Sequence, residues 1–358
     1  MYVCPRCNGS AISRGTRSGK RQIRCKDCNK YSTIPLEVSQ PIPDGYVVKG
    51  QSILYDAEGN VKQKWEKIDK DKQTTNLSEI LEAIKENIEP VEPAKAPSHN
   101  NSELMNVYVI TDYHLGMFAL KEESGADWDM KIAEQTLVRF FQQGIKQSPK
   151  AKYGVLANIG DFLHFDSFEP CTPASKHILD ASTRYQQLIR TSIRLFRYVI
   201  DMMLEKYEEV IVLMCDANHD PASEAWLRES FSALYSNEPR VKVDNSMDTY
   251  YCVEHGDVSL FFHHGHKRKM SNLDTVLASK YRDVFGRTRM SYAHTGHYHH
   301  IEQKETNLMV LEMHRTLASG DAYSSRGGYM SGRDAKVITY HRDYGEVCRQ
   351  IISVDLIS

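Results

Sequence analysis

The sequence lacks any long hydrophobic run, because none of its 358 residues falls in a stretch that approaches eighteen consecutive apolar side chains. Its first ten residues, MYVCPRCNGS, also lack the charged-then-apolar order of a secretory signal. We therefore expect no membrane span and no export, and we predict a cytoplasmic location.

The chain also has little net charge, with 45 basic and 47 acidic residues and a formal net charge of −2. With 41% hydrophobic residues, this balance excludes a disordered chain and a wholly basic packaging protein. The length indicates one large domain plus a smaller one. The charge is uneven, because residues 1–34 hold eight basic residues and one acidic residue. A polyanion is therefore expected to meet this segment first.

The cysteines do not form a disulfide framework, because four of the eight lie in two CxxC pairs and the others are scattered. The pairs, CPRC and CKDC, are seventeen residues apart, which is the spacing of a four-cysteine zinc ribbon. The predicted ligands of one structural zinc ion are Cys4, Cys7, Cys25 and Cys28. Basic side chains between the pairs could contact nucleic-acid phosphates: Arg14, Arg17, Lys20, Arg21 and Arg24. The alternatives are a solvated surface or a protein-docking module.

Four segments are expected. Residues 1–34 form the zinc ribbon, and residues 35–75 contain a β-hairpin whose turn holds Gly59 and Asn60. Residues 76–103 form a short amphipathic helix and a Pro-rich linker. Residues 104–358 form the catalytic domain.

The last segment alternates buried strands with helices, which predicts an α/β fold. Strands are expected at 104–111, 153–159, 209–215, 258–263 and 290–295, followed by NLMVLEMH and AKVITYH. Helices are expected near 128–147, 221–235 and 271–285. The longest helix is expected to begin after Thr172 and Pro173, which suit a cap and a first-turn proline, and to end near residue 206.

Polar motifs follow each of the first five strands. They are TDYHLG, IGDFLHFD, CDANHD, HHGH and TGHYHH. Because the carboxyl ends of the strands share one edge of an open α/β sheet, these residues are expected to converge. Mixed oxygen and nitrogen donors favour Mn²⁺, Fe²⁺ or Zn²⁺ over Ca²⁺. The number of donors fits two ions that share a bridging carboxylate better than one ion.

In this order and at these spacings, the motifs resemble those of the calcineurin-like metallophosphoesterase superfamily over residues 104–358. The resemblance implies a two-sheet sandwich flanked by helices, in which Asp161 bridges two divalent ions, with Mn²⁺ preferred. It implies these metal ligands: Asp112, His114, Asp161, Asn218, His264, His297 and His299. A metal-activated hydroxide would be the nucleophile, and His219 would be the general acid, oriented by Asp220 or another carboxylate.

Three departures from the motifs leave questions open. Ala217 stands where the third motif usually has glycine, so this turn must suit an L-residue. The second motif has His164 where an aspartate is usual, with Asp166 two residues later, and either could support the site. In HHGH the residue just before the glycine, His264, is the expected ligand, and His263 and His266 are alternatives.

The predicted activity is phosphodiester hydrolysis of nucleic acid, with DNA favoured over RNA, because a basic ribbon is joined to the phosphoesterase-like segment. This combination resembles phage-type and nuclease-like members of the superfamily. A glycine-rich loop at 315–334 is a candidate substrate lid, with these candidate contacts: Arg315, Tyr323, Arg326, Tyr329 and Arg333. The alternatives are a phosphatase or small cyclic-nucleotide-type phosphodiesterase whose ribbon docks to a partner, and a catalytically silent nucleic-acid-binding scaffold. Homo-oligomer formation is left open.

Overall fold

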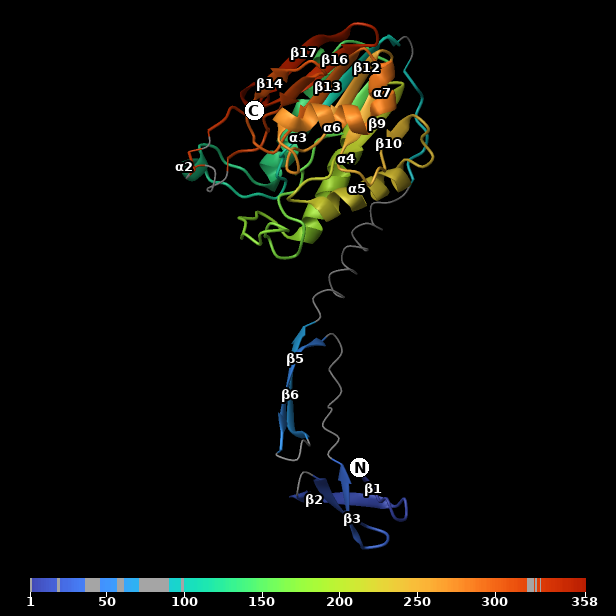
Figure 1. Cartoon of the computed structure of the whole chain (residues 1–358), viewed down its shortest axis with the longest axis vertical. Helices are drawn as coiled ribbons and strands as arrows, with labels where there is room; N and C mark the ends of the chain where they lie inside the picture. Colours follow the sequence, from blue (N-terminus) through green and yellow to red (C-terminus); the bar gives the residue numbers. More distant parts are fainter. Residues whose placement is uncertain are drawn as a thin grey trace. The chain divides into compact units, whose positions relative to one another are not determined.

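The structure is a computed structural model that describes residues 2–17, 20–35, 46–56, 61–70, 90–97, 100–320, 325, 327–328 and 330–358. The chain divides into two compact units, Met1–Ser78 and Glu79–Ser358 (Figure 1). Within the described ranges, no helix combines the length and the hydropathy that a membrane crossing requires.

The N-terminal ribbon is a four-stranded antiparallel sheet in the order β1-β2-β3-β4. Its strands are β1 (Tyr2–Val3), β2 (Ser10–Arg17), β3 (Lys20–Cys25) and β4 (Tyr31–Pro35). Each CxxC pair is followed by an asparagine with positive φ, Asn8 at 56° and Asn29 at 58°. Asparagine tolerates this left-handed conformation better than most residues, so each asparagine lets the chain turn back after its cysteine pair.

The predicted hairpin is present and is longer than the sequence pattern indicates. Strands β5 (Tyr46–Tyr55) and β6 (Val61–Lys70) pair antiparallel with two bulges. The turn positions Gly59 and Asn60 and the helix expected within 76–88 lie outside the described residues.

The Pro-rich segment at 90–100, expected to be part of a linker, makes hydrogen bonds to the rest of the second unit. The Val91 amide donates to the Leu234 carbonyl (2.7 Å), and the Ala94 amide donates to Glu238 Oε2 (2.8 Å). The Asn100 side chain donates to the Lys206 carbonyl (3.1 Å). These bonds hold the described part of this segment against the rest of the second unit, which therefore extends to residues before β7.

The second unit is built on two sheets. The first has the order β10-β9-β8-β7-β16-β17, and the second has the order β11-β12-β13-β15-β14. In the first sheet β7 to β10 are parallel, and β16 and β17 are antiparallel additions. Its strands are β7 (Leu104–Ile110), β8 (Tyr153–Asn158), β9 (Glu209–Met214), β10 (Val241–Val243), β16 (Asp334–His341) and β17 (Gly345–Ser353). Those of the second sheet are β11 (Tyr251–His255), β12 (Val258–Phe262), β13 (Met290–Thr295), β14 (Glu302–Glu305) and β15 (Val310–Met313).

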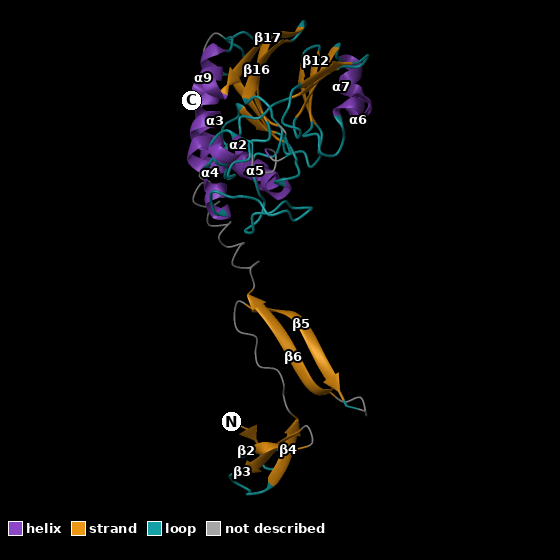
Figure 2. Ribbon diagram, turned by 90° about the vertical axis from the view of Figure 1, so that its left-hand side faces the viewer, coloured by secondary structure: helices purple, strands orange, loops and turns teal. Residues whose placement is uncertain are grey.

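Helices cover the outer faces of the two sheets (Figure 2). The first sheet is covered by α3 (Met130–Gln147), α4 (Tyr185–Lys206), α5 (Pro221–Leu234) and α9 (Val354–Ile357), and the second by η1 (Met270–Asn272), α6 (Leu273–Lys280) and α7 (Arg282–Arg287). The short α2 spans Lys121–Ser124. Alternation along β7 separates two cores, because Val107 and Val109 pack between the sheets while Tyr108 and Ile110 pack against the helices. The predicted two-sheet α/β sandwich flanked by helices is confirmed.

The predicted start of the longest helix is wrong. Helix α4 begins at Tyr185, and residues 173–184 form a loop. The Thr172 hydroxyl accepts a hydrogen bond from the His177 amide (3.0 Å), so it closes a local turn and does not cap a helix. Ile178, which appeared to extend the apolar stripe, is 90% exposed.

Candidate active site

The seven predicted metal ligands lie in five loops that leave the carboxyl ends of parallel strands. Asp112 and His114 follow β7, and Asp161 follows β8. Asn218 follows β9, and His264 follows β12. The loop after β13 carries the remaining two, His297 and His299. Since parallel strands end at one edge of a sheet, residues 187 positions apart in the sequence meet at this edge.

The donors form two adjoining clusters. Asp112, His114 and His299 place ligand atoms within 4.8 Å of one another, and Asp161, His264 and His297 do the same. His264 Nε2 lies 3.1 Å from both Asp161 Oδ2 and Asn218 Oδ1.

Two further distances relate the clusters. His299 Nε2 lies 3.2 Å from Asp112 Oδ1 in the first cluster. His264 Nε2, from the second cluster, is 3.9 Å from the same oxygen. The clusters therefore adjoin at the Asp112 carboxylate.

Each carboxylate is held by one oxygen and presents the other to the donors. Asp112 Oδ2 accepts hydrogen bonds from the Thr111 hydroxyl (2.7 Å) and the His297 amide (2.8 Å). Asp112 Oδ1 is buried and, among the described residues, faces the imidazole nitrogen of His299 at 3.2 Å without a hydrogen bond of regular geometry. Asp161 Oδ1 accepts from the amides of Asn218 (3.1 Å) and His219 (2.8 Å). An unpartnered buried carboxylate oxygen among imidazoles suits a divalent cation, so these residues fit the predicted metals.

The backbone is constrained where the ligands lie. Five of them have left-handed backbone conformations, with φ from 48° to 75°: Asp112, His114, Asp161, His297 and His299. Such conformations cost free energy in residues with a Cβ and persist where surrounding contacts enforce them. Gly296 lets the loop after β13 pass close to Thr111, because a Cβ on this residue would lie 1.9 Å from Thr111 Oγ1. Ala217, which stands where the motif usually has glycine, does not have a positive φ, so its backbone conformation suits an L-residue, as expected.

The carboxylates and imidazoles of the site shift one another's pKa values. Burial opposes a charge on His264, but Asp161 and Asp112 raise its pKa to about 9. Burial would raise the pKa of Asp161, but His264 and His219 hold it below its ordinary value. Burial and the neighbouring His219 and His164 rings hold the pKa of His114 well below its usual range. His114 is therefore neutral at pH 7, the form in which imidazole binds a metal.

His219 is oriented by a backbone carbonyl. Its Nδ1 lies 2.9 Å from the His164 carbonyl oxygen, which can only accept, so Nδ1 carries the proton. The prediction that Asp220 orients this ring is wrong. Asp220 is buried and its Oδ2 accepts from the Leu163 amide (2.7 Å), while burial and Glu224 raise its pKa well above the ordinary value.

Asp166 and His164, either of which could support the site, have different surroundings. Asp166 accepts hydrogen bonds from the amides of Ala222 (2.7 Å) and Ser223 (2.9 Å) at the start of α5. It therefore fixes the helix that follows His219. His164 lies beside the site, with Nδ1 3.4 Å from Nδ1 of His114 and its ring stacked near that of His219.

The three histidines of HHGH are also distinguished. His264, the expected ligand, belongs to the second donor cluster. His263 Nδ1 lies 3.1 Å from the Thr249 carbonyl, on the side of β11. The ring of His266 lies near those of His264 and His297, and its Nε2 is 4.0 Å from Asp216 Oδ2.

Two candidate substrate residues of the 315–334 loop are engaged within the domain. Arg315 Nη1 bonds to Asp334 Oδ2 (2.8 Å). Arg333 donates to the carbonyls of Leu317 and Ala318 and lies over the Trp128 ring at 5.3 Å. These contacts give both side chains a structural role. The other candidates lie outside the described residues: Tyr323, Arg326 and Tyr329.

Sequence reasoning missed the groups that support the ligands. Thr111 holds Asp112 through its hydroxyl, and the Thr316 hydroxyl donates to the Asp112 carbonyl (2.6 Å). The position of Thr111 beside the first aspartate was the only available signal, whereas Thr316 comes from 204 residues downstream.

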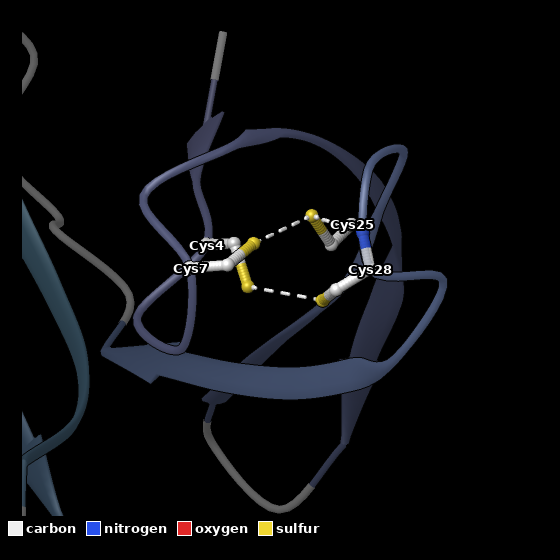
Figure 3. A group of neighbouring side chains, drawn as sticks. All are labelled: Cys4, Cys7, Cys25 and Cys28. Carbon is white, nitrogen blue, oxygen red and sulfur yellow. Dashed lines mark hydrogen bonds between the residues drawn. The ribbon is translucent and has the colours of Figure 1, made fainter.

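The four ribbon cysteines form a separate cluster in the first unit (Figure 3). The sulfur atoms of Cys4 and Cys28 are 3.8 Å apart, and those of Cys7 and Cys25 are 3.5 Å apart. A zinc ion with four sulfurs at about 2.3 Å requires sulfur separations of about 3.8 Å. The cluster therefore fits a structural zinc site.

Two basic side chains of the ribbon lie over tyrosine rings. Arg21 lies over the Tyr2 ring (5.1 Å), and Arg24 lies over the half-exposed Tyr31 ring (5.8 Å). Arg14 and Lys20 are exposed, and the side chain of Arg17 lies outside the described residues.

No family model and no curated protein sequence matches the chain. Among solved structures, a predicted phosphoesterase from Streptococcus pneumoniae is similar at 11% identity, covering 71% of this chain and 99% of that chain with a TM-score of 0.30. An archaeal phosphodiesterase is similar at 12% identity, with 69% and 100% covered and a TM-score of 0.36. A zinc-complexed Vps29 from Entamoeba histolytica is similar at 12% identity, with 70% and 99% covered and a TM-score of 0.28.

The second unit is a two-sheet sandwich flanked by helices, and the predicted donors meet at its strand ends in two adjoining clusters. The fold that the five motifs indicate, that of the calcineurin-like metallophosphoesterases, is therefore confirmed, and the donors that the resemblance implies lie together at its strand ends.

Proposed function

We propose that the second unit is a phosphodiesterase that uses two divalent metal ions, and that the full chain acts on nucleic acid. The observation that carries the hydrolase assignment is the pair of adjoining donor clusters in which Asp112 and Asp161 are each held by one oxygen. Two bound ions would supply Lewis acidity and neutralise charge on the phosphate oxygens. The donor set suits Mn²⁺, with Fe²⁺ or Zn²⁺ as alternatives.

The protein's own residues orient the proton donor. The His164 carbonyl fixes the His219 ring through Nδ1, which leaves Nε2 to hold a proton for the leaving oxygen. His219 lies against the His114 ring, with centroids 4.7 Å apart, so it is placed beside the first donor cluster. We also propose a cytoplasmic location, where the zinc-site cysteines and the four other cysteines would stay reduced.

Replacing His219 by alanine is expected to lower kcat on bis(p-nitrophenyl) phosphate by about 10² to 10⁴-fold, the usual contribution of a positioned general acid. Metal content should remain that of the unaltered protein, because the side chain is not among the predicted ligands. Steady-state kinetics and elemental analysis test both statements. The exposed His177 replaced by alanine is the control, and full activity in His219→Ala protein would refute the role.

The nucleic-acid part of the proposal rests on the ribbon. Its sequence carries eight basic residues against one acidic residue, and Arg24 lies over an exposed tyrosine ring. Guanidinium groups pair with phosphates, and exposed aromatic rings stack on bases. A tether between the ribbon and a phosphodiesterase would raise the local concentration of a polynucleotide at the site.

The variant K20Q/R21Q/R24Q tests this assignment in the full chain. If the three side chains contact phosphates, the slope of log kcat/KM against log salt on long DNA should become shallower by about 2 to 3. Activity on bis(p-nitrophenyl) phosphate should not change. Equal effects on both substrates would instead favour a phosphatase or small phosphodiesterase whose ribbon docks to a protein.

A further inference from the structure

Among the described residues, the β5–β6 hairpin has no further strand paired to either edge. The described residues place β5 and β6 in a sheet of their own, in which each strand has one partner. Both strands are ten residues long. An isolated two-stranded sheet of this kind is marginally stable in water, and its unpaired backbone groups can accept a further strand.

The two edges differ in how they are protected. Strand β6 reads VKQKWEKIDK and carries six charged residues, whereas β5 reads YVVKGQSILY and carries one. Charged residues, lysine above all, are a usual device for blocking an edge strand. The β6 edge is therefore blocked, and the β5 edge is the one that can accept a partner.

The β5 strand also exposes apolar side chains. Val48, Ile53, Leu54 and Tyr55 are each more than one third exposed. These residues lie toward the two ends of the strand, with Lys49, Gly50, Gln51 and Ser52 between them. The surface that remains uncovered is thus apolar at both ends and polar at its centre.

This order makes β5 complementary to itself. When two copies run antiparallel with Gln51 opposite Gln51 of the second copy, Gly50 lies opposite Ser52. Across the bulge between Val48 and Gly50, Val48 then lies opposite Ile53 of the second copy, and the reverse pair also forms. Within the hairpin, Val48 pairs with Ile68 and Ile53 pairs with Lys64, four positions apart on β6. Val48 and Ile53 therefore lie on the same face of the sheet despite the intervening bulge, as directly opposed residues must.

We propose that β5 pairs antiparallel with β5 of a second copy of this chain, which makes a four-stranded sheet with the order β6-β5-β5-β6 across a twofold axis. Such an interface is isologous, because each copy contributes the same strand. The occupant is a second copy because the strand's apolar ends match each other in register.

Three double variants of the full chain test the pairing and its register. V48K/I53K places two lysines opposite two lysines, so the dimer dissociation constant should rise by tenfold or more, about 1.4 kcal/mol. V48K/I53E places lysine opposite glutamate in both pairs, so the dimer should persist. V61K/I68K removes two exposed apolar residues from β6 and should leave dimerisation unchanged.

Sedimentation velocity over a wide protein concentration range measures each constant, and circular dichroism with zinc content shows that each variant is folded. A monomeric unaltered protein would overturn the proposal. Dimers that survive V48K/I53K would place the contact elsewhere, and loss of the dimer in V48K/I53E would overturn the register. Phosphodiesterase activity is measured in parallel, so failure of the enzymatic assignment is seen separately from failure of this one.

Discussion

Asn in place of Asp161 is expected to lower kcat/KM for phosphodiester hydrolysis by on the order of 10³-fold or more. Asp161 is predicted to bridge the two ions, and its Oδ2 lies 3.1 Å from His264 Nε2. Lewis-acid stabilisation by bound metals contributes several kcal/mol, and each 1.4 kcal/mol changes a rate tenfold. An amide that replaces the bridging carboxylate removes a negative charge from the donor set while keeping its shape.

The fold should survive this change, because the remaining oxygen can still accept from the Asn218 and His219 amides. Binding to the native state raises the melting temperature of a protein, so Mn²⁺ should stabilise the unaltered chain and have a smaller effect on Asp161→Asn protein. Thermal melts with and without Mn²⁺ give this readout independently of activity. The exposed Asp283 replaced by asparagine is the matched control. An unchanged Mn²⁺ shift in the Asp161 variant would contradict the ligand assignment.

The sequence predicted the sheets and the convergence of the donors because both depend on local patterns. Strands buried on both faces appear as apolar runs, and Val107 to Ile110 show why, since alternate residues enter different cores. Parallel strands then bring their ends to one edge whatever the length of the connections. The donor residues could therefore be grouped without knowing any distance between them.

The start of α4 could not be predicted because a helical apolar spacing is no evidence of burial. Ile178 fits the stripe of the helix, yet it lies in a loop and its side chain is exposed. Thr172 has the hydroxyl of an N-cap, but this hydroxyl accepts from the turn at His177. A threonine hydroxyl accepts hydrogen bonds from backbone amides both in turns and at helix starts, so the residue type does not distinguish the two structures.

The orientation of His219 was missed for a different reason. A carboxylate next to it in the sequence was the available candidate, but the group that accepts from Nδ1 is the His164 backbone carbonyl. Every residue has a carbonyl, so the sequence carries no signal for this role. The left-handed backbone at Asp112 and His297 also has no signal in the sequence. Gly296 is an exception, because a glycine is needed where the chain passes close to Thr111.

Serine in place of Cys25 is expected to unfold the ribbon and to leave the second unit folded. Among the described residues of the ribbon, the buried apolar side chains are few: Cys4, Ala11, Ile23 and Cys25. So small a core supplies little burial energy, whereas a structural zinc site contributes about 10 to 16 kcal/mol to folding. The Cys25→Ser protein should therefore lose zinc and the amide protection of β2 and β3.

Hydrogen exchange read by mass spectrometry, with zinc measured on the same samples, tests this expectation in the full chain. Peptides from the second unit should keep their protection, since the two units are separately compact. Cys348→Ser is the control, because Cys348 lies on β17 and outside the cluster. Protected β3 amides in a zinc-free Cys25→Ser protein would mean that strand pairing, and not the metal, holds the ribbon together.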